Sequence, residues 1–286
     1  MLNQETQIAV DKGEMLPLME EFYTIQGEGY HTGTAAYFIR IGGCDVGCHW
    51  CDVKESWNAE LHPPTATDLI VENASKYSET VVVTGGEPLM SGNTWKLFDW
   101  FKDNPTSDMR FAINSNLVPE NERQFQKLID ASHSIKNFEI YTSAEAGALQ
   151  SEYIRDGFNY VEWRSNIERM LKQSNVSKLH CMMTINSLCL ETITDFMDDM
   201  LELRKEYGQR APTMTLNILR FPSFQSCAII PVELKKTFKD KIENWLPTQM
   251  DHLTVGEISH IQRLIDYLDV VKTPHRDTSE TPKLYN

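Results

Sequence analysis

The chain has 286 residues, of which 41% are hydrophobic, enough to bury one substantial core. Asp and Glu number 41 against 27 Lys and Arg, and the resulting net charge of −14 argues against binding to a nucleic-acid backbone. No apolar run reaches the length of a transmembrane helix and no signal peptide is evident, so we expect a cytoplasmic protein with reduced thiols and no membrane contact.

Strand-like and helix-like segments alternate along the chain. The predicted strands are short and mostly apolar, with the β-branched and aromatic residues typical of buried parallel strands. They are Ala35–Ile41, Thr80–Val83, Arg110–Asn114, Phe138–Thr142, Leu179–Thr184 and Met214–Leu219. The predicted helices begin near Thr65 and Pro119, include the stretch from Trp95 to Phe101, and cover about 160–173, 188–207, 231–246 and 255–270.

This alternation predicts an α/β fold with a parallel sheet and right-handed crossovers. Six strand–helix units fit a partial (βα)6 TIM-like barrel. We expect residues 1–225 to form this core domain, and residues 226–286 to form a C-terminal helical extension with a polar tail.

Three cysteines follow the first predicted strand with the spacing C-x3-C-x2-C: Cys44, Cys48 and Cys51. Cysteine thiolates are the usual ligands of iron–sulfur clusters, and three of them leave one iron of a four-iron cluster open to a small molecule. A zinc site completed by His49 or His62 is the main alternative, and ordinary thiols remain open as well.

A second motif follows the second predicted strand, where a β-branched run ends in Gly85-Gly86-Glu87-Pro88. The glycines allow the backbone to approach a ligand closely, although an ordinary turn has the same composition. The carboxyl ends of parallel strands meet at one edge of a barrel, where active sites lie. The cysteine loop, the glycine loop and the ends of the third and fourth predicted strands are therefore expected to meet there.

Together these motifs resemble the radical S-adenosylmethionine (SAM) superfamily, whose signature is C-x3-C-x-aromatic-C followed by a Gly-Gly-Glu-Pro loop. The resemblance implies that the three cysteines hold a [4Fe–4S] cluster and that its open iron chelates SAM. One-electron cleavage of SAM then yields a 5′-deoxyadenosyl radical. The residues that this resemblance assigns to the cofactor in the first half of the chain are Trp50, Asp52, Gly85, Gly86 and Glu87.

Residues 1–90 resemble the 7-carboxy-7-deazaguanine synthase family of queuosine biosynthesis, in the stretches Glu21–Gly29, Ala36–Cys44 and Cys51–Lys54. That family rearranges 6-carboxy-5,6,7,8-tetrahydropterin to 7-carboxy-7-deazaguanine, which is a lyase reaction. The substrate-binding residues that the resemblance implies are Ile25, Gln26, Gly27, Arg40 and Thr84. Each of these has a structural alternative. Residues 26–29 could form an ordinary turn, Arg40 could pair within the strand with Glu28 or Asp52, and Thr84 could be a hydroxyl that ends a strand.

Magnesium use is left open by the residue that follows Asp52. Many synthases have a threonine there that helps to ligate the ion, whereas this chain has Val53, which has no side-chain oxygen. The neighbouring aspartate, the substrate or water would have to supply the oxygen ligands.

Residues 91–270 resemble the longer, twitch-type radical SAM proteins. The resemblance places two strand ends against the cofactor ribose, namely Asn114-Ser115-Asn116 and Thr142-Ser143, and lets Arg155 bind the methionyl carboxylate. An ion pair of this arginine with Asp156 or Glu152 is the alternative. This half favours a second hypothesis, a radical SAM enzyme that acts on another substrate such as a peptide or a sugar.

The remaining expectations concern partners. We expect a small-molecule substrate and a one-electron donor such as flavodoxin or ferredoxin, while a homodimer stays open. Cys181, Cys189 and Cys227 are scattered rather than grouped, so we expect them to be core residues and not ligands of a second cluster. A non-enzymatic zinc-binding protein is the remote third hypothesis.

Overall fold

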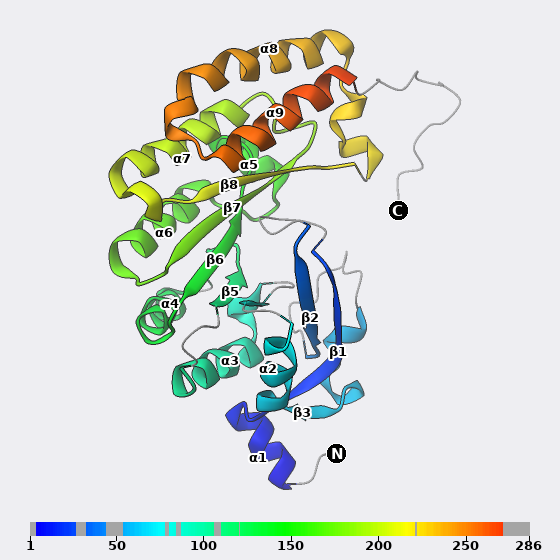
Figure 1. The fold of residues 1–286 in the computed structure, drawn as a ribbon, viewed down its shortest axis with the longest axis vertical. Coiled ribbons are helices and arrows are strands. Elements are labelled where there is room, and N and C mark those ends of the chain that lie inside the picture. Colours follow the sequence, from blue (N-terminus) through cyan, green and yellow to red (C-terminus); the bar gives the residue numbers. More distant parts are fainter. Residues whose placement is uncertain are drawn as a thin grey trace, which may run out of the picture.

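The computed structural model describes residues 4–26, 33–43, 54–77, 80–83, 87–105, 110–119, 121–220 and 222–270 (Figure 1). Its larger sheet contains five parallel strands in the order β4-β5-β6-β7-β8. These strands are β4 (Thr80–Val83), β5 (Arg110–Asn114), β6 (Phe138–Ser143), β7 (Lys178–Ile185) and β8 (Thr213–Ile218). The predicted α/β class with a parallel sheet is therefore confirmed.

Helices connect the parallel strands, and Figure 1 shows α4, α6 and α7 lying along one side of the sheet. The helices of this part are α3 (Gly92–Asp103), α4 (Glu122–Ser134), α5 (Ala148–Ile154), α6 (Tyr160–Gln173) and α7 (Ile193–Tyr207). Three helices begin later than the sequence predicts. The helix expected at Pro119 starts only after Asn121, whose side chain accepts a hydrogen bond from the Gln124 amide as an N-cap. The helix expected from 188 starts at Ile193, and the one expected near Thr65 starts at Thr67, because 64–66 form a strand.

One face of the parallel sheet packs against these helices and is apolar. Phe111 and Phe138, on neighbouring strands, both contact Phe98 of α3, with ring centroids 5.1 and 5.4 Å apart. Further along, the Trp163 indole of α6 donates a hydrogen bond of 2.8 Å to the Thr142 hydroxyl. Side chains at alternate strand positions share a face, so these residues define the helix-facing side of the sheet.

The other face carries the intervening residues and is polar near the start of the strands. His180 lies with its Nε2 atom 3.6 Å from the Glu139 carboxylate, while its Nδ1 atom shares a hydrogen bond of 2.7 Å with Thr213. The Tyr141 ring stacks on the His180 ring at 4.6 Å, and Arg110 lies 3.8 Å from Glu139. We call this the inner face.

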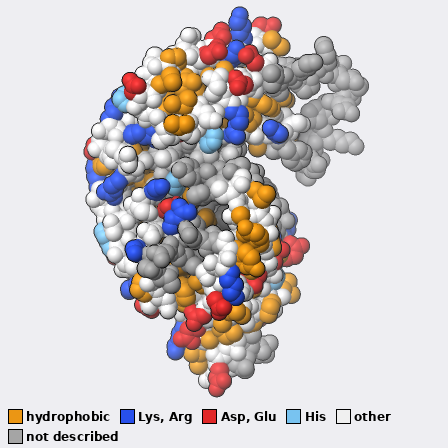
Figure 2. Space-filling model, viewed as in Figure 1, with side chains coloured by type: hydrophobic (Ala, Val, Ile, Leu, Met, Phe, Trp, Pro, Cys, Tyr) orange, Lys and Arg blue, Asp and Glu red, His pale blue; other side chains and the backbone are white. Residues whose placement is uncertain are grey.

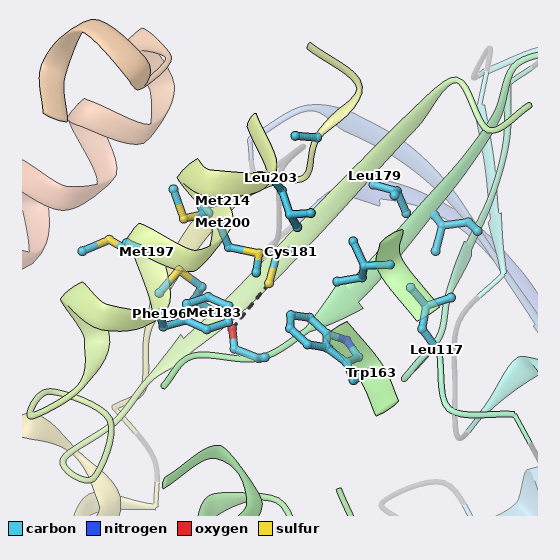
Figure 3. Close-up of a cluster of buried hydrophobic side chains, with 14 of the residues drawn as sticks. Leu117, Trp163, Leu179, Cys181, Met183, Phe196, Met197, Met200, Leu203 and Met214 are labelled. Carbon is cyan, nitrogen blue, oxygen red and sulfur yellow. Dashed lines mark hydrogen bonds between the residues drawn. The ribbon is translucent and has the colours of Figure 1, made fainter. Parts of the chain in front are cut away.

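The hydrophobic core lies between the parallel sheet and its helices. Figure 3 shows part of it, with Trp163 of α6, Cys181 and Met183 of β7 and the side chains of α7 packed together. Cys181, Cys189 and Cys227 are all fully buried free thiols, and the Cys181 thiol lies 3.5 Å from the Ala144 carbonyl oxygen. Burial raises the pKa of Cys181 and of Cys227 to about 12, so both remain protonated and act as small core residues.

The first predicted strand does not join the parallel sheet in the described residues. It is β2 (Ala35–Ile41), which pairs antiparallel with β1 (Met15–Ile25) in a second sheet of order β2-β1-β3, completed by β3 (Pro64–Ala66). Five of the six predicted strands thus share one sheet. The sequence analysis missed β1, because its MLPLMEEFYTI sequence contains a proline and two adjacent glutamates, and only Leu16 and Pro17 of the strand are buried.

This smaller sheet is flanked by α1 (Gln4–Lys12) and α2 (Thr67–Ser75), and Figure 1 shows its β1–β2 hairpin on the side of the parallel sheet opposite α4, α6 and α7. The hairpin is rich in exposed aromatic and aliphatic side chains, including Phe22, Tyr23 and Ile25, which are 41%, 52% and 66% exposed. Figure 2 shows a hydrophobic patch over this hairpin.

The predicted C-terminal helices are α8 (Val232–Gln249) and α9 (Val255–Val270). Glu257 of α9 forms two hydrogen bonds with Arg204 of α7, at 2.7 and 2.8 Å, and accepts a third from the Met214 amide of β8 at 2.7 Å. These bonds attach α9 to the parallel sheet. No helix among the described residues is long and apolar enough to cross a membrane.

Candidate active site

A cavity of about 390 Å³ opens where β5 and β6 end. Its walls come from the segment after β4, from the ends of β5 and β6, and from the α5–α6 connection. The lining residues are Glu87, Asn114, Ser115, Asn116, Val118, Ser143, Arg155, Asp156, Gly157 and Phe158. Six of the residues that the sequence assigns to the cofactor are therefore brought together in one cavity.

Glu87 connects the end of the glycine loop to the end of β5. One carboxylate oxygen accepts hydrogen bonds from the Ser115 hydroxyl at 2.7 Å and the Leu89 amide at 3.1 Å, and the other accepts from the Asn116 amide at 2.6 Å. Burial raises the pKa of Glu87, and these hydrogen bonds offset only part of that effect. The side chain therefore fixes two loops relative to each other.

The residues after β5 form a tight turn that presents polar groups to the cavity. The Ser115 amide continues the parallel ladder by donating to the Tyr141 carbonyl at 2.8 Å. The Asn116 side chain accepts from the Val118 amide at 2.8 Å, and Leu117 between them has φ of 54°. Asn116 thus shapes the turn with its side chain while also lining the cavity.

Of the two predicted residues at the end of β6, only Ser143 lines the cavity. Thr142 is fully buried on the helix-facing side, where its hydroxyl accepts the hydrogen bond from Trp163. Neighbouring residues of a strand point to opposite faces, which explains why one of the pair lines the cavity and the other lies in the core.

Arg155 lies in the wall of the cavity and forms an ion pair with a residue that the sequence analysis did not single out. Its Nε and Nη2 atoms donate to one carboxylate oxygen of Glu145, at 3.1 and 2.6 Å. The expected alternative partners are not used, since Glu152 accepts instead from the Tyr160 amide. The sequence feature that could have pointed to Glu145 is its position as a lone acidic residue among small residues, in Ser143-Ala-Glu-Ala-Gly147.

Burial raises the pKa of Glu145, and the Arg155 charge together with a hydrogen bond from the Thr184 backbone lowers it in part. The buried Glu145 carboxylate therefore lies directly behind Arg155, which is the one arginine among the described residues that line the cavity.

The predicted cluster ligands Cys44, Cys48 and Cys51 lie outside the described residues, as do the predicted site residues Gly27, Trp50, Asp52, Thr84, Gly85 and Gly86, and Val53. Within the described ranges, no group of three His, Cys, Asp or Glu side chains could hold a metal ion.

The two ends of the cysteine loop are described, and they are tied together. The Gly43 amide donates to the Ser56 carbonyl at 2.7 Å, and Gly43 has φ of 91°, a conformation that favours glycine. His62 packs against Gly42, where an added Cβ would lie 2.3 Å from the imidazole, and His62 Nε2 donates to the Glu55 carbonyl at 2.9 Å. This nitrogen of His62 is therefore engaged with the backbone.

The described substrate candidates lie on the β1–β2 hairpin. Arg40 pairs with Glu20, its directly opposite neighbour in the antiparallel register, while the expected alternatives Glu28 and Asp52 lie outside the described residues. Ile25 is exposed at the end of β1, and the Gln26 backbone closes the hairpin through hydrogen bonds with Thr34 and Gly33. The hairpin thus holds these three residues on one element.

Comparison with known proteins identifies the family. The model of the radical SAM superfamily matches residues 38–203. The chain belongs to the radical SAM superfamily. The match begins within β2 and ends within α7, so this radical SAM region includes both the cysteine motif and the cavity.

Curated proteins similar to this radical SAM chain include several named 7-carboxy-7-deazaguanine synthase. The one from Flavobacterium psychrophilum is 82% identical over 97 residues, which are 34% of this chain and 44% of that protein. The one from Escherichia coli is 61% identical over 93 residues, covering 25% and 42%, and the one from Synechocystis is 51% identical over 75 residues, covering 26% and 36%. The chain spans less than half the length of these relatives.

Among solved structures, a crystal structure of QueE from Escherichia coli is similar over 75% of this chain and 88% of that chain, with 20% identity and a TM-score of 0.39.

Membership of the radical SAM superfamily implies a [4Fe–4S] cluster and SAM. The described residues fit the second of these, because the cavity offers a guanidinium, amide and hydroxyl groups to a polar, zwitterionic ligand.

Proposed function

We propose that the protein is a 7-carboxy-7-deazaguanine synthase, which converts 6-carboxy-5,6,7,8-tetrahydropterin to 7-carboxy-7-deazaguanine. The observation that carries the proposal is the 82% identity to the synthase from Flavobacterium psychrophilum over 97 residues. The radical SAM match and the cavity beside the ends of β5 and β6 support it.

In this proposal, SAM and the cluster supply a 5′-deoxyadenosyl radical that abstracts hydrogen from the substrate. Cys44, Cys48 and Cys51 hold the cluster. The cavity residues bind and orient SAM, with Arg155 at its carboxylate and the Asn114–Asn116 and Ser143 groups at its ribose. Trp50, Asp52 and Gly85–Glu87 complete the cofactor site.

The substrate is proposed to bind between the hairpin and the inner face of the parallel sheet. Arg40 supplies the bidentate cation for the pterin carboxylate, and Ile25, Gln26, Gly27 and Thr84 contact the ring. Glu20, which pairs with Arg40, holds the guanidinium in place before the substrate arrives.

Replacement of Arg40 tests this assignment. Arg40→Lys keeps the charge but loses the bidentate fork. The value of kcat/KM for carboxytetrahydropterin should therefore fall, and the fall should correspond to a loss of about 2–4 kcal/mol of transition-state stabilisation. Slow cleavage of SAM without substrate should continue at the wild-type rate. Both rates are measured by chromatography of 7-carboxy-7-deazaguanine and 5′-deoxyadenosine under anaerobic conditions.

Arg123→Lys is the matched control, because Arg123 lies on α4, outside the SAM cavity and the hairpin. It should leave both rates unchanged. If Arg40→Lys reduces SAM cleavage and substrate turnover equally, the arginine does not bind the pterin carboxylate.

A second candidate is a radical SAM enzyme that acts on another substrate, such as a peptide or a sugar. It is favoured by the extent of the matches, since that with Flavobacterium psychrophilum covers only 34% of the chain. Product analysis separates the two candidates. A cluster-loaded wild-type protein that makes 5′-deoxyadenosine but no 7-carboxy-7-deazaguanine from carboxytetrahydropterin would favour the second.

Several expectations accompany the proposal. The electron donor is of the flavodoxin or ferredoxin type, the protein acts in the cytoplasm, and residues 1–225 form the catalytic domain with 226–286 as an extension. Magnesium, if the reaction uses it, is held through Asp52, substrate and water, because Val53 offers no oxygen.

A further inference from the structure

Glu145 supports the cavity from behind without lining it. Its carboxylate is 2% exposed, whereas the Arg155 side chain in front of it is 29% exposed. Both hydrogen bonds from Arg155 reach the same oxygen, Oε2, and they come from the Nε–Nη2 edge of the guanidinium. Arg155 lines the cavity and Glu145 does not.

This arrangement leaves a defined part of the guanidinium for a ligand. Arginine carries five N–H donors in a rigid plane, and Glu145 takes one edge of that plane. Within the described part of the chain, Nη1 of Arg155 donates to no protein group, and Arg155 donates only to Glu145. Two bonds to one edge fix the orientation of the whole plane.

Glu145 is itself held firmly. It follows β6 between Ala144 and Ala146, which are both fully buried, and it receives a hydrogen bond from the backbone of Thr184 on the neighbouring strand β7. Two residues later, the Gly147 amide donates to the Thr192 hydroxyl at 2.9 Å. The carboxylate is therefore part of the rigid sheet edge rather than of a surface loop.

We infer that Glu145 is a positioning residue for the carboxylate of the bound cofactor. It holds Arg155 so that the unused donors of the guanidinium meet the carboxylate of SAM, and it does not touch the cofactor itself. The inference rests on the proposed binding of SAM in this cavity. In the opposite arrangement, Glu145 would simply neutralise Arg155, and removing its charge would then strengthen the binding of anions.

Two nucleoside probes distinguish these arrangements. S-Adenosylhomocysteine carries the amino acid carboxylate, whereas 5′-methylthioadenosine lacks the amino acid portion and keeps the adenosine. Their dissociation constants are measured by calorimetry on the anaerobically reconstituted protein. In Glu145→Gln, the constant for S-adenosylhomocysteine should rise about tenfold, as when the partner that orients a ligand-binding group is lost. The constant for 5′-methylthioadenosine should change less than about twofold, because it has no carboxylate to misplace.

A double-mutant cycle shows whether Glu145 acts through Arg155. Arg155→Gln should weaken S-adenosylhomocysteine binding by itself, and adding Glu145→Gln should weaken it no further. Glu162→Gln is the matched control, because Glu162 is an exposed carboxylate at the start of α6 and outside the cavity. It should bind both probes as the wild type does.

Thermal melting of each variant checks that the fold is retained. If Glu145→Gln does not fold, Glu145→Asp keeps the charge and shortens the reach by one methylene, and it should show the same selective loss. Equal losses for both probes, or tighter binding of S-adenosylhomocysteine, would overturn the inference. A wild-type protein that binds neither probe would overturn the cofactor site as well, whereas failure to make 7-carboxy-7-deazaguanine would affect only the proposed reaction.

Discussion

The two sheets of the molecule differ in how they bury aromatic side chains. In the parallel sheet, Phe111 is fully buried and its ring contacts Phe98, Phe101 and Phe138 within 5.5 Å. In the β1–β2 hairpin, Phe22 stacks on the ring of Phe38 at 5.4 Å and remains 41% exposed. The parallel sheet therefore carries the stability of the fold, while the hairpin offers apolar surface that remains available for binding.

The comparison predicts that the largest effect on stability will come from the parallel sheet. Phe111→Ala should lower the free energy of unfolding by about 4 kcal/mol, since it removes a buried ring from a close-packed cluster. Urea denaturation followed by tryptophan fluorescence measures the change. Phe111→Leu should cost less than about half of that, and a loss for Phe111→Ala as small as that for Phe22→Ala would remove the distinction between the sheets.

A smaller but pH-dependent effect is expected where α9 joins the parallel sheet. Burial by itself would raise the pKa of Glu257, but the hydrogen bonds and charge of Arg204 and the amides of Thr254 and Met214 outweigh it, so the pKa lies below its ordinary value. Glu257→Gln should cost about 3 kcal/mol at neutral pH, because it leaves Arg204 without its buried partner.

The sign of the pH dependence follows from this lowered pKa. The stabilisation is fully present above the ordinary carboxyl pKa of about 4.3, and it is lost as the pH falls through the lower pKa of the folded state. The difference in unfolding free energy between wild type and Glu257→Gln should therefore shrink below about pH 4. A difference that stays constant down to acidic pH would show that Glu257 is not ionised in the folded protein.

An intermediate effect is expected at the start of the cysteine loop. Gly43→Ala forces a side chain into a φ of 91° and should cost about 1–2 kcal/mol, with reduced iron retention after anaerobic reconstitution. Iron content per chain and the visible absorption spectrum measure the loss. Gly92→Ala is the control, since nothing lies within 4 Å of an added Cβ there, and it should retain iron as the wild type does.

The smallest effect on stability is expected in the hairpin. Phe22→Ala should lower the free energy of unfolding by at most about 1 kcal/mol, because the ring is partly exposed and stacks on a single ring within the described ranges. If the hairpin surface contacts the substrate as proposed, the KM of this variant for carboxytetrahydropterin should rise even though the protein remains folded. A substrate KM equal to that of the wild type would restrict the role of Phe22 to packing.

Sequence reasoning predicted the parallel strands well, because each is a short apolar run ending in polar residues, and this pattern is local. It also identified the family through Cys44, Cys48 and Cys51, since their spacing carries its chemistry without reference to the fold. It did not find β1, whose proline and glutamates obscure the strand pattern, and so it assigned β2 to the wrong sheet.

The site was predicted in part for a related reason. Six cofactor candidates converge because they follow strand ends, which a parallel sheet brings to one edge. The separation of Ser143 from Thr142 depends on which face of β6 each occupies. The pairing of Arg155 with Glu145 depends on how helix α5 returns the chain to the end of β6, ten positions later. Neither follows from local sequence.

The alternation of the strands has a consequence for how such a chain can evolve. The strands β5, β6 and β7 contribute helix-facing side chains, such as Phe111 and Phe138, and inner-face side chains, such as Glu139 and His180. Substitutions at the second set leave the aromatic packing of the first intact. A lineage can therefore inherit the scaffold and exchange its chemistry through every other residue of the same strands.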